Sequence, residues 1–337
     1  MSGTIVVWGA GAIGGTIGAH LVRGGHQVLF VDRVPEHAAA INASGLKIIG
    51  PVREFTARAL AATPDAVQGT LDTVLLCVKA QDTEAAARAI APHLAPDGCI
   101  VSVQNGLNET VIAGVVGAAR TVGAFVNFGA DYMEPGVVQH AGRGAVVVGE
   151  IDGRITERAK RLHALLREFD DCAVLTGNIW GYLWAKLAYG AMLFATALTN
   201  ESMADCLASP LRRPLFVALA REVMTVADRA GIKPEPFDGF DPGAYASNDG
   251  ATRSLDALVD HNRRSAKSHS GIWRDLAVRK RKTEADPQLG PIVTTAQRHS
   301  LSAPITARLI TMIHEIEEGK RPMAWANLDE LAKVIAA

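Results

Sequence analysis

The sequence predicts an α/β chain in which an N-terminal domain with a parallel sheet precedes an all-helical C-terminal domain. Short apolar runs alternate with helical patterns up to about residue 177, as expected for strand–helix–strand units. From residue 178 onward the periodicity is helical, apart from a loop at 233–245. We therefore expect two domains, 1–177 and 178–337, because a chain of 337 residues is long enough for two hydrophobic cores.

A glycine-rich turn after the first strand is the most informative motif. Residues 4–8 form an apolar, β-branched run, which is typical of a buried parallel strand. Gly9 then permits a tight turn, Gly11 lets a pyrophosphate approach the backbone, and Gly14 lets the next helix pack close to the strand. The N-terminus of that helix offers N–H groups to a phosphate. The expected cofactor-binding turn comprises Gly9, Ala10, Gly11, Ala12, Ile13 and Gly14.

A second strand at 27–31 follows the helix and ends in Asp32 and Arg33. Strand, glycine turn, helix, strand and acid occur in the order of a Rossmann-type dinucleotide-binding domain, with the acid about twenty residues beyond the turn. The alternative is an ordinary strand–helix–strand turn that binds no ligand. Asp32 stands where an acid binds the ribose hydroxyls of NAD and repels the 2′-phosphate of NADP.

Two later strands of this domain also end in polar residues. A buried strand at 71–78 leads to Lys79, and a strand at 99–103 leads to Asn105 in a Gln-Asn-Gly turn. Open α/β sheets bind their ligands at this carboxyl edge. The other elements that we expect in this domain are helices at 36–44, 83–94 and 155–169, strands at 45–50, 55–61, 122–128, 145–148 and 173–175, and a hairpin within 129–144.

The composition argues against several other classes of protein. A net charge of −1 is not that of a nucleic-acid binder, which carries a basic stripe. The four cysteines are far apart and lie mostly in apolar runs, so we expect buried, reduced thiols and a cytoplasmic protein. The N-terminus has no signal-peptide pattern, and the longest apolar stretch, 184–199, contains Lys186 and is too short to span a bilayer. We expect no membrane segment and no metal site.

Four motifs in chain order resemble the ketopantoate reductase family. They are Lys79, Gln104-Asn105-Gly106, Trp184-Ala185-Lys186-Leu187 and Lys282-Thr283-Glu284, supported by Gly136–His140 and by the order Ser270, Arg274, Asp275. The resemblance implies a Rossmann domain followed by a helical domain, with the active site in the cleft between them. It also implies an NADP(H)-dependent oxidoreductase of pantothenate biosynthesis, which reduces a 2-oxo acid, as from ketopantoate to pantoate.

The resemblance assigns roles to five residues. Lys186 corresponds to the general acid, and Glu284 to the carboxylate that binds the substrate hydroxyl and supports the lysine. Asn105 and Lys79 correspond to residues near the nicotinamide and the substrate, and Ser270 to a substrate-binding serine. His140 also matches a family motif, but in a hairpin we interpret it as structural.

Lys186 is also the strongest candidate on chemical grounds. A lysine within an apolar helical run is unusual, and burial disfavours its charged form, so its pKa falls and it becomes a better proton donor near neutral pH. A positioned ammonium can stabilise a developing alkoxide and protonate it. The alternatives are a lysine whose head group reaches solvent, a surface glutamate at Glu284, ordinary turn chemistry at Asn105 and a solvent-exposed Lys79.

The chain departs from the family at the residues that hold the substrate. Asparagines one and two helical turns after the catalytic lysine are replaced by Gly190 and Phe194. A further asparagine aligns with Ala204, although Asn200 and Ser202 are close enough in the chain to take its place. The second serine of a Ser-Ser pair is also missing, because Gly271 follows Ser270. Since lost hydrogen-bond partners change substrate preference strongly, ketopantoate itself is left open as the substrate.

Three further questions are left open by the sequence. Arg33 aligns with the arginine that binds the 2′-phosphate, so we favour NADP(H), while Asp32 leaves NAD(H) open. The alternative functions are a dehydrogenase of another polar or branched 2-hydroxy acid, an opine-type enzyme, or a non-catalytic NAD(P)-binding sensor. The helical domain has enough apolar surface for a homodimer, which the sequence does not decide.

Overall fold

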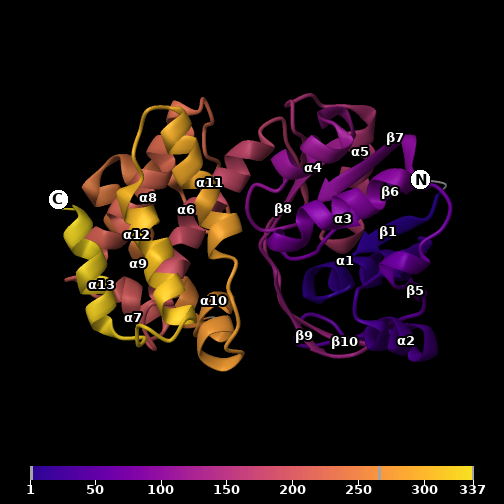
Figure 1. The fold of residues 1–337 in the computed structure, drawn as a ribbon, viewed down its shortest axis with the longest axis horizontal. Coiled ribbons are helices and arrows are strands. Elements are labelled where there is room, and N and C mark those ends of the chain that lie inside the picture. Colours follow the sequence, from indigo (N-terminus) through magenta and orange to yellow (C-terminus); the bar gives the residue numbers. More distant parts are fainter. Residues whose placement is uncertain (1–2, 265–266, 336–337) are drawn as a thin grey trace. The chain divides into compact units, whose positions relative to one another are not determined.

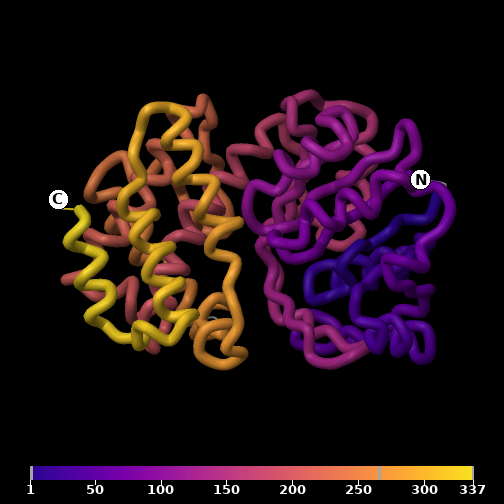
Figure 2. Tube along the Cα trace, in the orientation of Figure 1, coloured from indigo at the N-terminus to yellow at the C-terminus, as the bar shows by residue number. Residues whose placement is uncertain are grey.

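The computed structural model describes residues 3–264 and 267–335. The chain divides after Ile179 into two compact units, the first containing the sheets and the second helical (Figures 1 and 2). The α/β and all-helical classes predicted from the sequence are therefore confirmed. The ranges 1–177 and 178–337 remain our proposed domain limits, and their outermost residues lie outside the described part of the chain.

The first unit is built on an eight-stranded sheet with the order β12-β11-β8-β7-β6-β1-β2-β5. Its neighbouring strands are parallel except for the antiparallel pair β8 and β11. The chain runs outward from β1 in one direction through β2 and in the other through β6, so the order reverses at β1. Ligands bind at such a reversal, beyond the carboxyl ends of the strands. The strands are β1 (Ile5–Trp8), β2 (Val28–Val31), β5 (Leu60–Ala62), β6 (Leu71–Leu76), β7 (Leu94–Ser102), β8 (Thr121–Val126), β11 (Val146–Glu150) and β12 (Val174–Leu175).

Helices cover both faces of this sheet, so the central strands are apolar on both sides. Ile5 and Val7 of β1 lie in one core with residues of α1 and α5, whereas Val6 and Trp8 lie in the other with residues of α3 and α4 (Figure 1). This alternation is the two-residue period of a strand. The helices of the unit are α1 (Ala12–Arg23), α2 (Pro35–Ser44), α3 (Thr83–Ile90), α4 (Glu109–Val116) and α5 (Glu157–Phe169).

A second, four-stranded sheet has the order β4-β3-β10-β9. Its strands are β3 (Leu46–Ile49), β4 (Phe55–Ala57), β9 (Gly129–Glu134) and β10 (Val137–Gly142). β9 and β10 form the hairpin expected within 129–144. The single strand expected at 55–61 is wrong, because β4 belongs to this sheet and β5 to the large one. Runs of three residues are too short for periodicity to separate them.

The second unit consists of helices. They are α6 (Ile179–Thr196), α7 (Met203–Ala208), α8 (Arg213–Arg229), α9 (Asn248–Arg264), α10 (Gly271–Trp273), α11 (Ala285–Arg298), α12 (Pro304–Glu317) and α13 (Trp325–Ala332). The apolar run at 184–199 lies largely in α6, with most of its leucine, alanine and phenylalanine side chains in the core. Within the described residues, the structure contains no helix of the length and apolarity needed to cross a membrane.

Candidate active site

The turn between β1 and α1 has the shape of a phosphate cradle. Gly9 has a φ of 100°, and a Cβ there would lie 2.8 Å from the backbone carbon of Cys77. A Cβ on Gly14 would overlap the carbonyl oxygen of Gly9 and lie 2.9 Å from a methyl carbon of Val7. At Gly11 a Cβ would meet nothing within 4 Å. Gly9 and Gly14 are therefore required by packing, whereas Gly11 leaves the backbone open to a ligand.

The N-terminus of α1 suits the pyrophosphate of a dinucleotide. Gly11 is the N-cap and supplies no side chain to the first N–H groups of the helix. A phosphate at this position would accept hydrogen bonds from those N–H groups and interact favourably with the helix dipole. The backbone carbonyl of Ala10 is held by the ring of His37, 2.9 Å away, which fixes the turn from behind. The residues present thus fit the cofactor that the sequence predicts.

Asp32 is held rigidly at the end of β2. Its Oδ2 accepts the N–H of Ala10 at 2.9 Å, and its Oδ1 accepts the N–H of Val34 at 3.0 Å. Arg33, in contrast, has 74% of its side chain exposed and pairs with Asp82 at 3.2 Å. The acid therefore faces the glycine turn, while the arginine is directed to another carboxylate.

Lys79 and Asn105 follow β6 and β7 at the carboxyl edge of the large sheet, and both are exposed. The Asn105 turn is held by a buried network that the sequence did not reveal. The side-chain amide of Gln104 donates to the Val78 carbonyl at 2.9 Å and to the Thr83 hydroxyl at 2.8 Å. That hydroxyl donates to Asn108, whose amide donates to the Asn105 carbonyl at 2.7 Å. These bonds fix the backbone of Asn105, whereas its side chain is exposed at the surface.

Lys186 lies in the middle of α6, between buried Ala185 and Leu187, and is itself partly buried. Burial lowers the pKa of its ammonium to about 8, although the charges of Asp238 and Glu284 act in the opposite direction. A pKa near 8 keeps the group largely protonated at neutral pH and makes it a stronger acid than a free lysine. This agrees with the chemical argument made from the sequence.

Glu284 precedes α11 as its N-cap residue and has 9% of its surface exposed. The residues on both sides of Glu284 are held by hydrogen bonds to Glu317 and His314 of α12. The backbone N–H and the hydroxyl of Thr283 each donate to Glu317 at 2.7 Å, and the ring of His314 lies 2.9 Å from both Glu317 and Asp286. Although burial opposes them, the two carboxylates raise the pKa of His314. The chain on either side of Glu284 is therefore anchored to α12.

Ser270 is buried, and its side chain serves a local purpose. Its hydroxyl oxygen accepts the N–H of Trp273 at 3.2 Å and so caps α10. The hydroxyl hydrogen is a separate donor, so capping does not prevent a bond to a substrate.

Asp238 is the member of this group that sequence analysis missed. It lies in the 233–245 loop and has a φ of 42°, a left-handed conformation that is uncommon outside glycine, asparagine and aspartate. The available signal was the Asp238-Gly239 pair, which is typical of a tight turn. Nothing local, however, relates that turn to α6.

The comparisons with known proteins agree over most of the chain. The family model described as Ketopantoate reductase PanE/ApbA matches residues 5–153, and the one described as Ketopantoate reductase PanE/ApbA C terminal matches residues 178–317. The chain belongs to the ketopantoate reductase family. It is therefore an NAD(P)-dependent oxidoreductase, as the resemblance of its motifs implied.

Relatives and solved structures cover nearly the full chain. The 2-dehydropantoate 2-reductases of Halobacterium salinarum and Archaeoglobus fulgidus are 28% and 27% identical, over 92% and 94% of this chain and 97% and 98% of theirs. A PanE/ApbA family ketopantoate reductase from Ralstonia eutropha JMP134 has a TM-score of 0.79 and 26% identity, covering 94% of this chain and 99% of that one. D-mandelate dehydrogenase with NADH and anilino(oxo)acetate has a TM-score of 0.82 at 21% identity, over 94% and 99%, which shows a shared fold.

The three positions at which the sequence analysis expects family asparagines to be replaced have two kinds of surroundings. At Gly190, one turn along α6, an added Cβ would meet nothing within 4 Å. Phe194, a turn further on, is completely buried, and Ala204 in α7 is also buried. Gly190 therefore has open space beside it, whereas Phe194 and Ala204 belong to the core.

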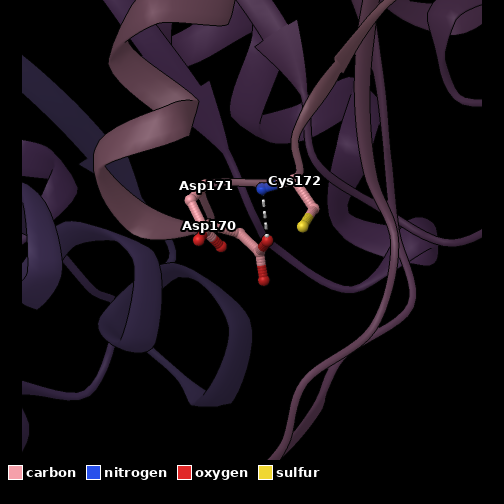
Figure 3. A group of neighbouring side chains, drawn as sticks. All are labelled: Asp170, Asp171 and Cys172. Atoms are coloured by element: carbon pink, nitrogen blue, oxygen red, sulfur yellow. Dashed lines mark hydrogen bonds between the residues drawn. The ribbon is translucent and has the colours of Figure 1, made fainter.

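Asp170, Asp171 and Cys172 have ligand-type atoms within 4.8 Å of one another, after the end of α5 (Figure 3). Arg143 pairs with both carboxylates, and the Cys172 N–H donates to Asp170 at 2.9 Å. A cation of the chain already occupies these acids, so we interpret the group as structural. Cys172 is exposed, contrary to the expectation of buried thiols.

His140 and Glu109 are buried titratable groups outside the candidate site. Burial lowers the pKa of His140 to about 4, and its ring packs edge-on to His20 at 5.5 Å. Burial raises the pKa of Glu109, at the start of α4, to about 8. The environment of His140 supports the structural interpretation made from the sequence.

The glycine geometry predicts opposite stability effects at two positions. Gly14→Ala should destabilise the first unit by at least 2 kcal/mol, on the order expected for overpacking against backbone. Gly190→Ala should stabilise the protein by about 0.5–1 kcal/mol, because the added methyl has room and glycine is unfavourable in a helix. Urea unfolding of both variants measures the difference, and a destabilised Gly190→Ala would show that the space beside α6 is filled.

Proposed function

We propose that the protein reduces a 2-oxo acid to a 2-hydroxy acid, with Lys186 as the general acid. The nicotinamide cofactor, when bound, supplies a hydride to the carbonyl carbon. As negative charge develops on the carbonyl oxygen, the Lys186 ammonium stabilises it and transfers a proton to it. The observation that supports this role is the lowered pKa, about 8, of a lysine on an apolar helix.

The other polar residues take complementary roles in this proposal. Glu284 accepts a hydrogen bond from the product hydroxyl and keeps a negative charge near the ammonium, an effect that the pKa of Lys186 reflects. Lys79 attracts the substrate carboxylate, Asn105 contacts the nicotinamide and the substrate, and Ser270 donates its hydroxyl hydrogen. These assignments follow the resemblance, and the exposure of Lys79 and Asn105 at the carboxyl edge of the sheet supports them.

The geometry around Asp32 favours NADH. The carboxylate is fixed at the end of β2 by two backbone N–H groups, where it can accept hydrogen bonds from the adenosine ribose. Arg33 pairs with Asp82 instead. The surroundings of Asp32 are negatively charged, since the pKa of the nearby Tyr132 is raised by burial and also by the charges of Asp32 and Glu36. A 2′-phosphate would meet this negative charge, so we propose NADH in place of the NADP(H) preference expected from Arg33.

The substrate assignment rests on the relatives and on α6. Relatives named 2-dehydropantoate 2-reductase make ketopantoate the first candidate. The space beside Gly190 and the burial of Phe194 favour a second candidate, another branched 2-oxo acid that does not need two amide groups. A non-catalytic sensor is the third alternative, but it would have no use for a lysine with a lowered pKa.

The compartment and assembly are further proposals. All four cysteines are free thiols, which supports a reducing, cytoplasmic environment. A homodimer stays a prediction.

Lys186→Ala should abolish turnover while cofactor binding is retained. We expect kcat for 2-oxo acid reduction to fall by a factor of at least about 10³, a typical contribution of a general acid that also stabilises charge. In the unaltered enzyme, kcat/KM should fall tenfold per pH unit above about pH 8, because the acid is lost as pH rises through its pKa. Steady-state rates and nucleotide titration by fluorescence test this. Unchanged turnover of Lys186→Ala would contradict the general-acid role, whereas nucleotide binding without any turnover in the unaltered protein would support the sensor.

Asp32→Asn should shift the enzyme toward NADPH. The amide keeps a hydrogen-bond acceptor but removes the charge that repels a 2′-phosphate, so the NADPH/NADH ratio of kcat/KM should rise about tenfold or more. Asp97→Asn, which removes an exposed charge in β7, is the matched control and should leave the ratio unchanged. A ratio that already favours NADPH in the unaltered enzyme would contradict the NADH proposal.

Gly190→Asn should improve the use of ketopantoate. The open space allows the side chain, and one new hydrogen bond to the substrate is worth about tenfold in kcat/KM. A panel of 2-oxo acids, followed by absorbance of the reduced nicotinamide, measures the change relative to Gly190→Ala. If the unaltered enzyme already prefers ketopantoate over the whole panel, the second candidate is removed.

A further inference from the structure

The loop between α8 and α9 contains a well-defined reverse turn at Phe237–Phe240. The N–H of Phe240 donates to the carbonyl of Phe237 at 2.7 Å, and the N–H of Phe237 donates back to Phe240 at 3.0 Å. The two central residues, Asp238 and Gly239, have φ values of 42° and 81°. Two positive φ angles closed by this pair of bonds define a type I′ turn, the turn of tight hairpins. Asp238 therefore has a fixed backbone position within an otherwise irregular loop.

Aromatic side chains attach this turn to α6. Phe237 and Phe240 are buried, and their ring centroids lie 6.1 and 5.7 Å from that of Tyr189. Phe240 also packs against Tyr245 at 5.5 Å. Tyr189 is three residues beyond Lys186, so the two side chains share one face of α6. The turn thus packs on the helix face that carries the candidate general acid.

The charge of Asp238 acts on two residues of that face. Burial lowers the pKa of Lys186, and the negative charges of Asp238 and then Glu284 partly reverse the effect. Burial raises the pKa of Tyr189, and the charge of Asp238 raises it further. Two residues one helical turn apart therefore respond to the same carboxylate, as expected if it lies beside this face.

The turn itself does not require a carboxylate. The first central position of a type I′ turn is occupied by asparagine at least as readily as by aspartate, because both tolerate a positive φ. The negative charge is therefore an additional property of this position, and Lys186 is the cation on the adjoining helix face that it influences.

We propose that Asp238 is a positioning residue of the active site, which together with Glu284 orients the Lys186 ammonium and keeps it charged. The proposal rests on the role of Lys186 proposed above. Two acids on separate elements, the 237–240 turn and the start of α11, restrain the flexible lysine side chain more than one would. The charges of both carboxylates act on Lys186. Two carboxylates therefore accompany Lys186, although Gly190, one helical turn further along α6, has no side chain that could contribute.

The test is Asp238→Asn, which removes the charge and preserves the turn. We expect the melting temperature to stay the same or rise. The alkaline pKa of kcat/KM for 2-oxo acid reduction should fall by about one unit from its value near 8. One unit is the lower end of the range of pKa shifts caused by a nearby opposite charge. At pH 6, where Lys186 stays protonated, kcat should remain well above that of Lys186→Ala. Asp260→Asn removes an exposed charge from α9 and should leave the pH profile unchanged.

The outcomes separate this proposal from the one on which it rests. If Lys186→Ala retains full turnover, the general-acid function itself is wrong. If Lys186→Ala is inactive but Asp238→Asn has the pH profile of the unaltered enzyme, only the role of Asp238 is wrong. An equal shift in Asp260→Asn would likewise overturn it, because the effect would then come from overall charge.

Discussion

Desolvation of the Lys186 ammonium is the constraint on which the helical unit depends. A charge taken from water into apolar surroundings is strongly unfavourable unless opposite charges accompany it. On α6 the neighbouring residues are buried and apolar, and the compensating carboxylates come from other segments, Asp238 and Glu284. The balance is incomplete, since the pKa stays at about 8. An incompletely stabilised ammonium near neutral pH is suited to giving up its proton.

The backbone segments that carry the two acids are anchored by other parts of the structure. Glu284 stands at the start of α11, beside a chain of hydrogen bonds that links Thr283, Glu317, His314 and Asp286. Asp238 stands in a turn fixed by backbone bonds and aromatic packing. Because both backbones are anchored independently, little reorganisation is needed when charge develops on a substrate, which is the condition for electrostatic stabilisation.

The first unit meets a different physical requirement. Its glycine turn must lie close to neighbouring backbone segments and must also leave room for a dinucleotide. Packing excludes a side chain at Gly9 and Gly14, and the open position of Gly11 at the N-terminus of α1 suits a phosphate. Asp32 is fixed by the N–H groups of Ala10 and Val34, so its position does not depend on a bound cofactor. The same unit therefore combines a glycine turn that suits a nucleotide with a fixed carboxylate at the end of β2.

Much of this was predictable because it depends on short-range patterns. The glycine spacing, the apolar strands that end at Lys79 and Asn105, and the lysine in an apolar helical run are local features, and they determined the fold class, the cofactor turn and the candidate acid. The division of 55–61 between two sheets, the pairing of Arg33 with Asp82 and the packing of the 237–240 turn on α6 were decided only by the tertiary structure. Each of these depends on which distant segment lies alongside, and residue periodicity carries no information about partners that are far apart in the chain.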